Sequence, residues 1–193
     1  MITQTGSDHI GDMICDFLRK NGVSDEFVCR HPNTKSHITL AFLNEHNDAQ
    51  YEFYKDHARD LLDIPLPQIT SDDIVLFGSF FAINPVIRSV TCKLITEAHE
   101  AGAWLYYDVN FRKNHIAELP AILPNIEENM RLASVVRGSM EDFDYLFGLQ
   151  DADTIYNRVR SLCTTLILTD GARSIRVYTP EGCETYPVAP IET

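Results

Sequence analysis

The sequence lacks long apolar runs, an excess of basic residues and paired cysteines. Its longest apolar runs, such as 74–77 and 103–107, fall far short of the roughly 20 residues that cross a bilayer, so we expect no membrane-spanning helix. It has 16 Lys and Arg against 28 Asp and Glu, and no stretch gathers the basic residues, which argues against nucleic-acid or anionic-membrane binding. The 5 cysteines form no CxxC pair, which argues against a disulfide framework or a zinc knuckle and favours a reducing, cytoplasmic setting.

Two phosphate-binding signatures are also absent. Neither GxGxxG nor GxxxxGK[ST] occurs, so the sequence has no dinucleotide fingerprint and no Walker-type loop. The histidines show no HExxH spacing of the kind that indicates a zinc enzyme. Nucleotide or metal chemistry would therefore depend on a different arrangement of residues.

Hydrophobic residues make up 45% of the 193 residues, and from residue 73 onward they alternate between two patterns. Continuous apolar runs that suit buried strands are followed by segments with helical periodicity. The predicted strands are 74–77, 103–108, 133–136 and 165–168, and the predicted helices are 85–101, 119–131, 140–147 and 152–162. This alternation predicts an α/β fold with a mainly parallel sheet, followed by two short antiparallel strands within 174–188.

The first third of the chain is organised differently. Apolar residues at helical spacing and the Asn21-Gly22 stop predict a short amphipathic helix over 11–21. Segments 37–43 and 51–54 are rich in β-branched and aromatic residues and flank a polar stretch, so they predict a β-hairpin outside the main sheet. Because the sequence ends directly after a predicted strand, we expect the layers of the α/β domain to be incomplete.

Polar or glycine residues follow each of the four predicted parallel strands. Ligands bind beyond the carboxyl ends of such strands in open α/β sheets, so these residues are expected to share one rim. They are Gly78 and Ser79, then Asp108, Asn110 and Arg112, then Arg137, Ser139 and Glu141, and finally Thr169 and Gly171. Each is also explained as an ordinary loop residue, with Ser139 as a helix cap, so both interpretations stay open.

The segment Asp108-Val-Asn-Phe-Arg112 has polar residues at alternating positions. In an extended chain the side chains of Asp108, Asn110 and Arg112 would leave the same face. A carboxylate, an amide and a guanidinium together suit a polyhydroxylated ligand or an anion held by the arginine fork. An internal ion pair between Asp108 and Arg112 explains the same spacing equally well.

The order of five segments resembles the ribokinase (PfkB) family of ATP-dependent sugar kinases. Gly6-Ser-Asp8-His-Ile-Gly11 followed by a helix and Asn21-Gly22-Val23 is similar to the GxDxxG segment of that family, and 34–43 with 51–55 and 58–60 is similar to its lid strands. The segment 108–112 looks like its DxNxR strand end, 136–148 its NxxE and LxG segment, and 169–171 its TxG nucleotide turn.

The resemblance implies a ribokinase-like three-layer α/β sandwich with a mainly parallel sheet and a small β-hairpin lid. The implied divisions are the start of the core at 1–33, the β-lid at 34–60 and the rest of the core at 61–193. The implied reaction is transfer of the ATP γ-phosphate, with Mg²⁺, to a hydroxyl of a sugar or sugar acid. A homodimer formed through the lid is a further implication.

The family's functional residues carry over one at a time. On the sugar side, Arg112 is the implied catalytic residue, Asn110 is implied to bind the sugar, and Lys55 and Phe53 of the lid are implied to contact it. On the nucleotide side, Thr169 and Gly171 are implied to line the triphosphate site. Glu141 is implied to organise the magnesium ion.

Some family features differ or are missing. Gly138 stands where the NxxE motif has its Asn, and Ser174 replaces a glycine after the nucleotide turn. The family's first strand and its GAGD loop, which carries the catalytic base, would lie outside these 193 residues, so we expect this chain alone to lack useful kinase activity.

Two rival functions remain open. One is a non-catalytic module with the same fold that binds a sugar or a nucleotide. The other is a hydrolase using Ser79 or Ser139, although Ser79 lies in Phe77-Gly-Ser-Phe-Phe81, which is not the GxSxG pattern of a nucleophile elbow.

Overall fold

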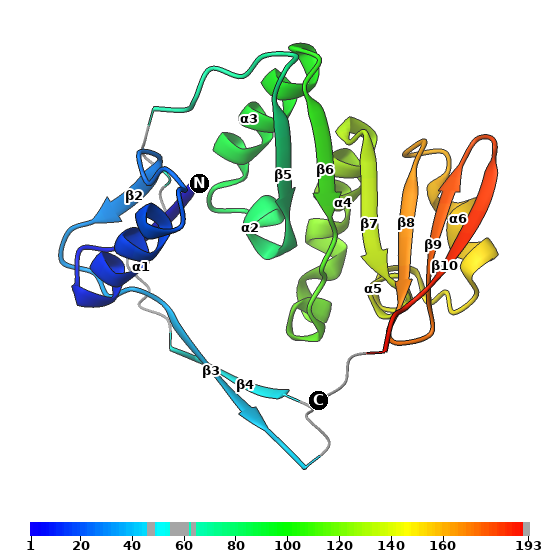
Figure 1. Cartoon of the computed structure of the whole chain (residues 1–193), viewed down its shortest axis with the longest axis horizontal. Coiled ribbons are helices and arrows are strands. Elements are labelled where there is room, and N and C mark those ends of the chain that lie inside the picture. Colours follow the sequence, from blue (N-terminus) through cyan, green and yellow to red (C-terminus); the bar gives the residue numbers. More distant parts are fainter. Residues whose placement is uncertain (46–48, 55–61, 63–64, 191–193) are drawn as a thin grey trace. The chain divides into compact units, whose positions relative to one another are not determined.

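The computed structural model describes residues 1–45, 49–54, 62 and 65–190. The chain divides into two compact units, Met1–Pro67 and Gln68–Thr193, which are treated separately below (Figure 1).

Unit 1 begins with a small parallel sheet and one helix. Strand β1 (Thr3–Gly6) pairs with β2 (Val28–His31), and helix α1 (His9–Lys20) connects them. Asp8 caps the helix, because its carboxylate accepts a hydrogen bond of 2.9 Å from the Gly11 amide. The predicted helix over 11–21 is confirmed with a start two residues earlier, whereas β1 and β2 were not predicted.

The rest of unit 1 contains an antiparallel hairpin. Strand β3 (Ile38–Leu43) pairs with β4 (Ala49–Tyr54), and the two form a sheet of their own, as the sequence predicts. The polar stretch predicted to connect them lies partly outside the described residues, since 46–48 are not described. All six residues of β3 are exposed, so neither face of this hairpin is buried within the unit.

Unit 2 is built on a six-stranded sheet with the order β10-β9-β8-β7-β6-β5. The parallel strands are β5 (Ile74–Gly78), β6 (Trp104–Asp108), β7 (Val135–Ser139) and β8 (Leu166–Asp170). Strands β9 (Ser174–Thr179) and β10 (Gly182–Pro187) add an antiparallel pair at one edge. The predicted α/β class and mainly parallel sheet are therefore confirmed.

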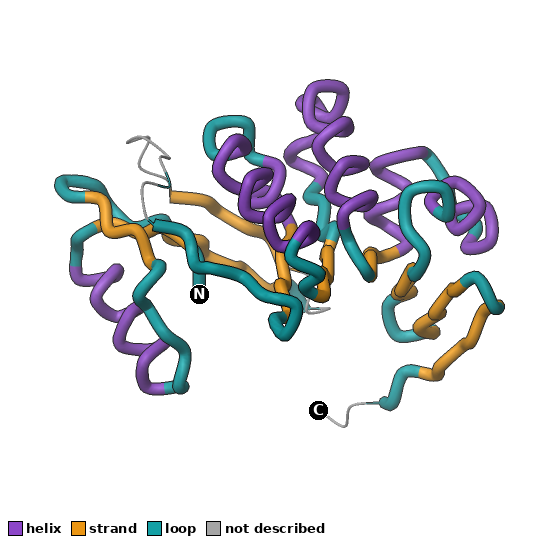
Figure 2. Tube along the Cα trace, turned by 90° about the horizontal axis from the view of Figure 1, so that it is seen from above, coloured by secondary structure: helices purple, strands orange, loops and turns teal. Residues whose placement is uncertain are grey.

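The helices of unit 2 lie on one face of this sheet, which is clearest in Figure 2. They are α2 (Ser79–Ile83), α3 (Arg88–Glu100), α4 (Leu119–Leu132), α5 (Met140–Phe147) and α6 (Ala152–Val159), with a 3₁₀ turn over Lys113–Glu118. The core between the helices and the sheet includes Tyr107, Ile126, Phe143 and Leu166, all fully buried. Within 68–190 no helix covers the opposite face, so these residues form two layers of the predicted three.

Two predicted helices differ in their bounds from those observed, because the one predicted over 85–101 starts later and the one predicted over 152–162 ends at Val159, as α6. The helix predicted over 85–101 begins only at Arg88, as α3, and the short helix α2, which ends at Ile83, was not predicted. Pro85 explains the break, because a proline disfavours helical geometry in the residue before it. In contrast, α4 continues through Pro124, which lies inside the helix.

The uncovered face of the sheet carries large apolar side chains. Ile74 is 72% exposed, Leu76 is 70% exposed and Trp104 is 49% exposed. Side chains alternate between the two faces along a strand. On β6, Leu105 and Tyr107 therefore point toward the helices, and both are fully buried. Among the residues with assigned structure, no helix has the length and apolar character needed to span a membrane.

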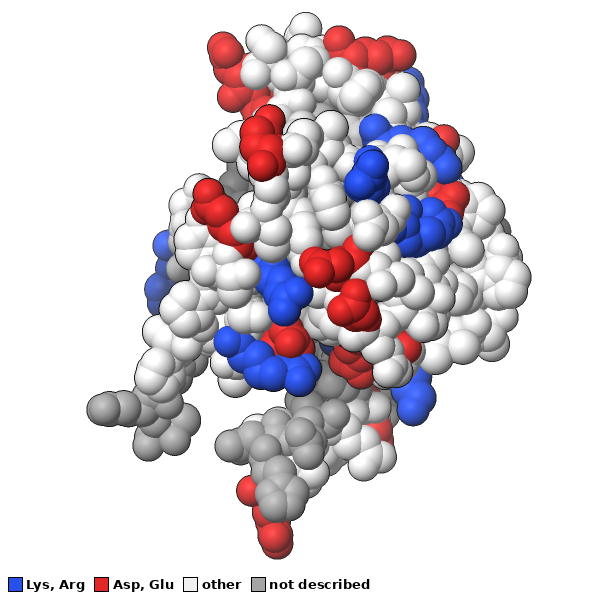
Figure 3. Space-filling model, turned by 90° about the vertical axis from the view of Figure 1, so that its right-hand side faces the viewer, with Lys and Arg blue, Asp and Glu red and all other residues white. Residues whose placement is uncertain are grey.

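Charged side chains are mixed on the side of the molecule that Figure 3 presents. Acidic and basic groups lie next to one another there, and no continuous basic stripe crosses that face. Ion pairs of this kind occur in unit 2, such as that between Arg158 and Glu127 at 2.5 Å.

Candidate functional site

The carboxyl ends of the four parallel strands lie side by side along one edge of unit 2. Gly78 of β5 is in register with Asp108 of β6, and Asp108 is in register with Arg137 of β7. Ser139 of β7 is in register with Thr169 of β8. The predicted common rim is thus present, and the arrows of β5 to β8 in Figure 1 point toward it.

The end of β5 approaches the end of β6 very closely. A Cβ atom placed on Gly78 would lie 2.1 Å from the backbone oxygen of Asp108, so only glycine fits there. Ser79 follows with φ of 52°, in the left-handed region that non-glycine residues rarely adopt. Its hydroxyl donates to the Asn110 carbonyl oxygen at 3.3 Å, which joins the two strand ends.

The chain after β6 is not extended, so the prediction that Asp108, Asn110 and Arg112 share one face is wrong. Strand β6 ends at Asp108, and Asn110 has φ of 38°, which turns the backbone. Asp108 also does not pair with Arg112. Its two carboxylate oxygens accept from the Arg137 guanidinium at 3.0 and 3.2 Å.

Arg112 ends this turn with its side chain exposed. Its guanidinium has no hydrogen-bond or ion-pair partner within the described part of the chain. Phe111 beside it is 5% exposed and anchors the turn in the core. A buried anchor next to an unpaired guanidinium is an arrangement that can present a cation to a ligand.

Asp142 is a residue of this rim that the sequence interpretation missed. It is 6% exposed, and its carboxylate accepts from the Ser139 amide at 2.6 Å and the Ser139 hydroxyl at 2.8 Å. It also accepts from the Phe111 amide at 2.7 Å. The Ser139-x-x-Asp142 spacing is a capping box, which was the available signal, and it confirms the interpretation of Ser139 as a cap.

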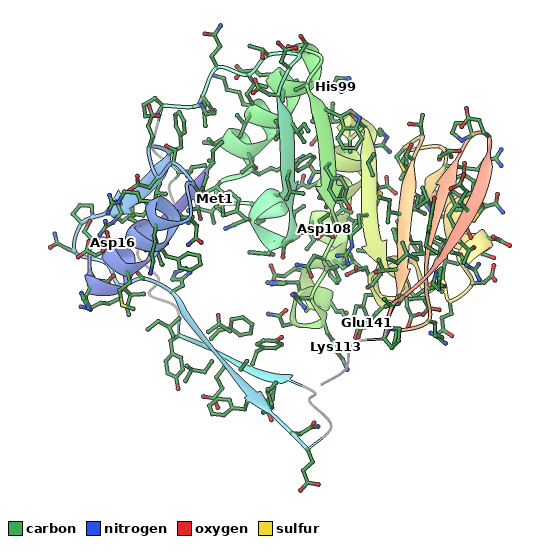
Figure 4. The ribbon with its side chains drawn as sticks, in the orientation of Figure 1. Met1, Asp16, His99, Asp108, Lys113 and Glu141 are labelled. Carbon is green, nitrogen blue, oxygen red and sulfur yellow. The ribbon has the colours of Figure 1, made fainter. Side chains whose placement is uncertain are left out.

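Glu141 lies at the start of α5 and is exposed (Figure 4). The Tyr145 hydroxyl donates to its carboxylate at 2.6 Å, and this hydrogen bond raises the pKa of Tyr145. Gly138 has no room for a side chain, because a Cβ atom there would lie 2.7 Å from the ring of buried Phe143. The missing Asn at this position therefore has a packing reason.

Thr169 and Gly171 lie at the end of β8. The Thr169 hydroxyl is 3.5 Å from the Gly138 carbonyl oxygen, a long and weak contact. Gly171 has φ of 53° and open space around its Cα atom. Asp170 between them pairs with Arg173, so its carboxylate is already engaged.

The predicted lid residues belong to unit 1. Phe53 lies on β4 opposite Thr39, is 50% exposed, and its ring centroid is 6.3 Å from that of Tyr51. Lys55 lies outside the described residues, as do 58–60 of the predicted lid.

Neither of two cavities found in the molecule includes a rim residue. One, of about 590 Å³, lies between α6 and the β9–β10 turn and is lined by residues such as Tyr156 and Cys183. The other, of about 580 Å³, lies in unit 1 beside Asp8, Lys35 and Tyr54. In the described segments, no three His, Cys, Asp or Glu side chains gather closely enough to hold a metal ion by themselves.

The fold and the rim define an α/β protein in which polar side chains that can bind a ligand gather beyond the carboxyl ends of the parallel strands. The model of the pfkB family carbohydrate kinases matches residues 1–193, and the chain belongs to this family. The resemblance inferred from the sequence motifs is thereby confirmed.

Several fructokinases are similar to this chain. "Probable fructokinase-5" of Arabidopsis thaliana is 26% identical over 184 residues, covering 92% of this chain and 57% of the relative. The fructokinase structure from Xylella fastidiosa has a TM-score of 0.77 at 24% identity, covering 100% of this chain and 61% of the other. The apo fructokinase from Vibrio cholerae O395 has a TM-score of 0.83 at 23% identity, covering 98% and 67%.

These likenesses to solved structures confirm a ribokinase-like fold. The chain spans only part of the length of its relatives, 57% in the case of the Arabidopsis protein.

Proposed function

We propose that the whole protein transfers the ATP γ-phosphate to a hydroxyl of a sugar or sugar acid, with a ketohexose such as fructose as the first candidate. Family membership supports the phosphotransfer, and the fructokinase relatives support the sugar. The observation that carries the proposal is the Arg112 guanidinium, which is exposed at the rim while its neighbours Asp108 and Arg137 neutralise each other.

The proposed residue roles are those that the family resemblance implies. Arg112 acts on the transferring phosphoryl group, and Asn110 contacts the sugar. Thr169 and Gly171 line the triphosphate site, where the open space at Gly171 lets the backbone approach a phosphate. Phe53 and Lys55 of the lid are the further residues proposed to contact the sugar. A similar fructokinase has been solved with bound ATP, which supports the use of this nucleotide.

Magnesium is the proposed metal, and the exposed carboxylate of Glu141 is its proposed protein contact. Mg²⁺ usually takes one or two protein carboxylates and completes its shell with water and substrate phosphates, so a single carboxylate at the rim fits. The ion would neutralise phosphate charge during transfer. A fructokinase of Vibrio cholerae solved with fructose, ADP and calcium supports the use of a divalent metal.

We also propose a homodimer formed through the β3–β4 hairpin, in a cytoplasmic setting. The exposed apolar residues on both faces of the hairpin support an interface there, Phe42 and Phe53 among them. The free cysteines support a reducing compartment.

Calorimetry with ATP and a sugar panel, combined with a coupled turnover assay, tests the function. We expect the 193-residue chain to bind ATP without useful turnover, and Arg112→Ala to weaken that binding about tenfold or more, since a charge-assisted contact is lost. Arg131→Ala is the matched control, because Arg131 is an exposed arginine on α4 away from the rim.

Unchanged ATP affinity in Arg112→Ala would contradict the proposed role of this residue. A full-length protein that binds ATP and sugar without turnover would favour the rival, non-catalytic module. Robust sugar-dependent turnover by the 193-residue chain would show that a base within this chain suffices.

A further inference from the structure

The backbone turn at 109–112 is held by contacts from three different elements. The Val109 amide donates to the Arg137 carbonyl of β7 at 2.9 Å. The Phe111 amide donates to the Asp142 carboxylate of α5 at 2.7 Å. The Asn110 carbonyl accepts from the Ser79 hydroxyl at the start of α2, at 3.3 Å. Each of the first three residues of the turn is therefore fixed by a partner far away in the sequence.

Asp142 is committed to this task by its surroundings. A carboxylate that is 6% exposed is unfavourable unless hydrogen bonds compensate for lost water. Oδ2 accepts both bonds from Ser139, and Oδ1 accepts the bond from Phe111. The carboxylate thus ties the end of β7 and the start of α5 to the turn after β6.

The turn also holds an unfavourable backbone conformation. Asn110 has φ of 38° and its partner Ser79 has φ of 52°, and neither is glycine. Left-handed residues of this kind persist where surrounding contacts over-determine them, and they are common where a loop is held ready for a ligand. Because Ser79 and Asn110 are both left-handed and are joined by a hydrogen bond, the turn has one preferred conformation.

We propose that Ser79 and Asp142 are positioning residues that fix the 109–112 turn, so that Asn110 and Arg112 are presented at the rim before a ligand binds. This inference rests on the proposed function, because it assumes that Arg112 contacts phosphate. The benefit is preorganisation: a turn that is already ordered loses little conformational entropy on binding. Neither residue touches the ligand, so both act through Arg112.

The first test concerns the turn itself and needs no ligand. Amide hydrogen exchange is measured by NMR on the ¹⁵N-labelled 193-residue chain and on Ser79→Ala, Asp142→Ala and Asp144→Asn. We expect Phe111 to exchange about tenfold faster or more in Asp142→Ala, and Asn110 and Arg112 signals to shift or broaden in Ser79→Ala. Asp144 is a half-buried acid on the same helix whose carboxylate accepts from Gln150, away from the turn, so its variant should match the wild type.

The second test separates positioning from general stability. ATP affinity is measured by calorimetry for Ser79→Ala, Arg112→Ala and the double variant. We expect Ser79→Ala to weaken binding about threefold to tenfold in the wild-type background and to have no further effect once Arg112 is removed, because the two residues act in one chain of contacts.

The outcomes distinguish the inference from the function. Losses that multiply in the double variant, or unchanged exchange and signals at 110–112 in both Ser79→Ala and Asp142→Ala, would overturn the positioning role. If Arg112→Ala leaves ATP affinity unchanged, the proposed phosphate contact of Arg112 fails, and the exchange data alone then decide whether the turn is held as described.

Discussion

At the scale of single residues, glycine is required at some positions by close packing and at others by backbone conformation. Gly78 and Gly138 exclude any side chain because a backbone oxygen and an aromatic ring occupy the space. A Cβ atom placed on Gly148 would have no other atom within 4 Å, yet this residue ends α5 with φ of 67°. The reason for glycine at 148 is therefore conformational alone.

Gly148→Ala isolates that conformational contribution. We expect it to lower the free energy of unfolding by about 1 kcal/mol, since an L-residue with a Cβ disfavours the left-handed region. Urea unfolding of both proteins measures the difference. Gly148→Asn should lose less, because asparagine tolerates this region best among residues with side chains, and equal stability of the alanine variant would refute the argument.

Asp8 makes the stability of unit 1 depend on pH in the acidic range. Bonds from the Ser36 hydroxyl, the Gly11 amide and the Ser36 amide hold the pKa of Asp8 well below its ordinary value of 3.8. A carboxylate with a lowered folded-state pKa stabilises the fold above its unfolded pKa, and that contribution is lost as the pH falls further.

We therefore expect unit 1 of the wild type to lose stability as the pH drops below about 4, and Asp8→Asn to lose that part of the pH dependence. Hydrogen exchange at the amides of unit 1, monitored as the protein is heated at each pH of a series, measures this loss of stability. Asp16→Asn serves as control, because Asp16 is exposed and contacts only Arg19. Parallel pH profiles for wild type and Asp8→Asn would contradict the prediction.

At the scale of elements, helix α4 contains two prolines in unequal positions. Pro120 is its second residue, where a missing amide hydrogen costs nothing, whereas Pro124 lies inside the helix. Both are exposed.

Pro124→Ala should raise the free energy of unfolding by about 1–2 kcal/mol, because the interior hydrogen bond is restored and only part of the gain is offset by a more flexible unfolded chain. Pro120→Ala should bring no gain. Denaturant unfolding of both variants provides the comparison, and a destabilised Pro124→Ala would mean that this proline stabilises the helix by its packing.

The same scale shows which elements the sequence predicts. Strands β5 to β8 were found because each contains the continuous apolar run that is typical of strands in a parallel sheet. Strands β1 and β2 were missed because each has only four residues, and β1 reads Thr-Gln-Thr-Gly, which carries no such run. Their pairing joins residues about one helix apart in sequence, and local patterns do not contain that information.

The candidate site was predictable to a similar degree. The shared rim follows from strand order, so its residues could be gathered from the sequence. The turn at Asn110 could not, because its shape depends on Ser79 and Asp142, each 31 residues from the turn residue that it bonds. Asp142 itself was marked by its capping-box spacing, but that pattern indicates a helix start and does not reveal the bond to Phe111.

At the scale of the whole molecule, the sheet of unit 2 is covered by the helices of its own unit on one face only. Parallel sheets are normally buried on both faces. Here Ile74 and Leu76 are 72% and 70% exposed, and Trp104 is 49% exposed beside them. A contiguous apolar surface of this kind favours association with another apolar surface.

We expect the 193-residue chain to bind the dye ANS and to self-associate as its concentration rises, since both processes remove this apolar face from water. Leu76→Lys combined with Ile74→Lys should reduce both effects, because burying two ammonium groups in an apolar contact is costly. Ile116→Lys is the matched control, as Ile116 is 41% exposed in the 3₁₀ turn and does not belong to the sheet. Fluorescence titration and sedimentation velocity measure the two properties. A wild-type chain that stays monomeric and dark with ANS, or an equal response from Ile116→Lys, would show that the uncovered face does not drive association.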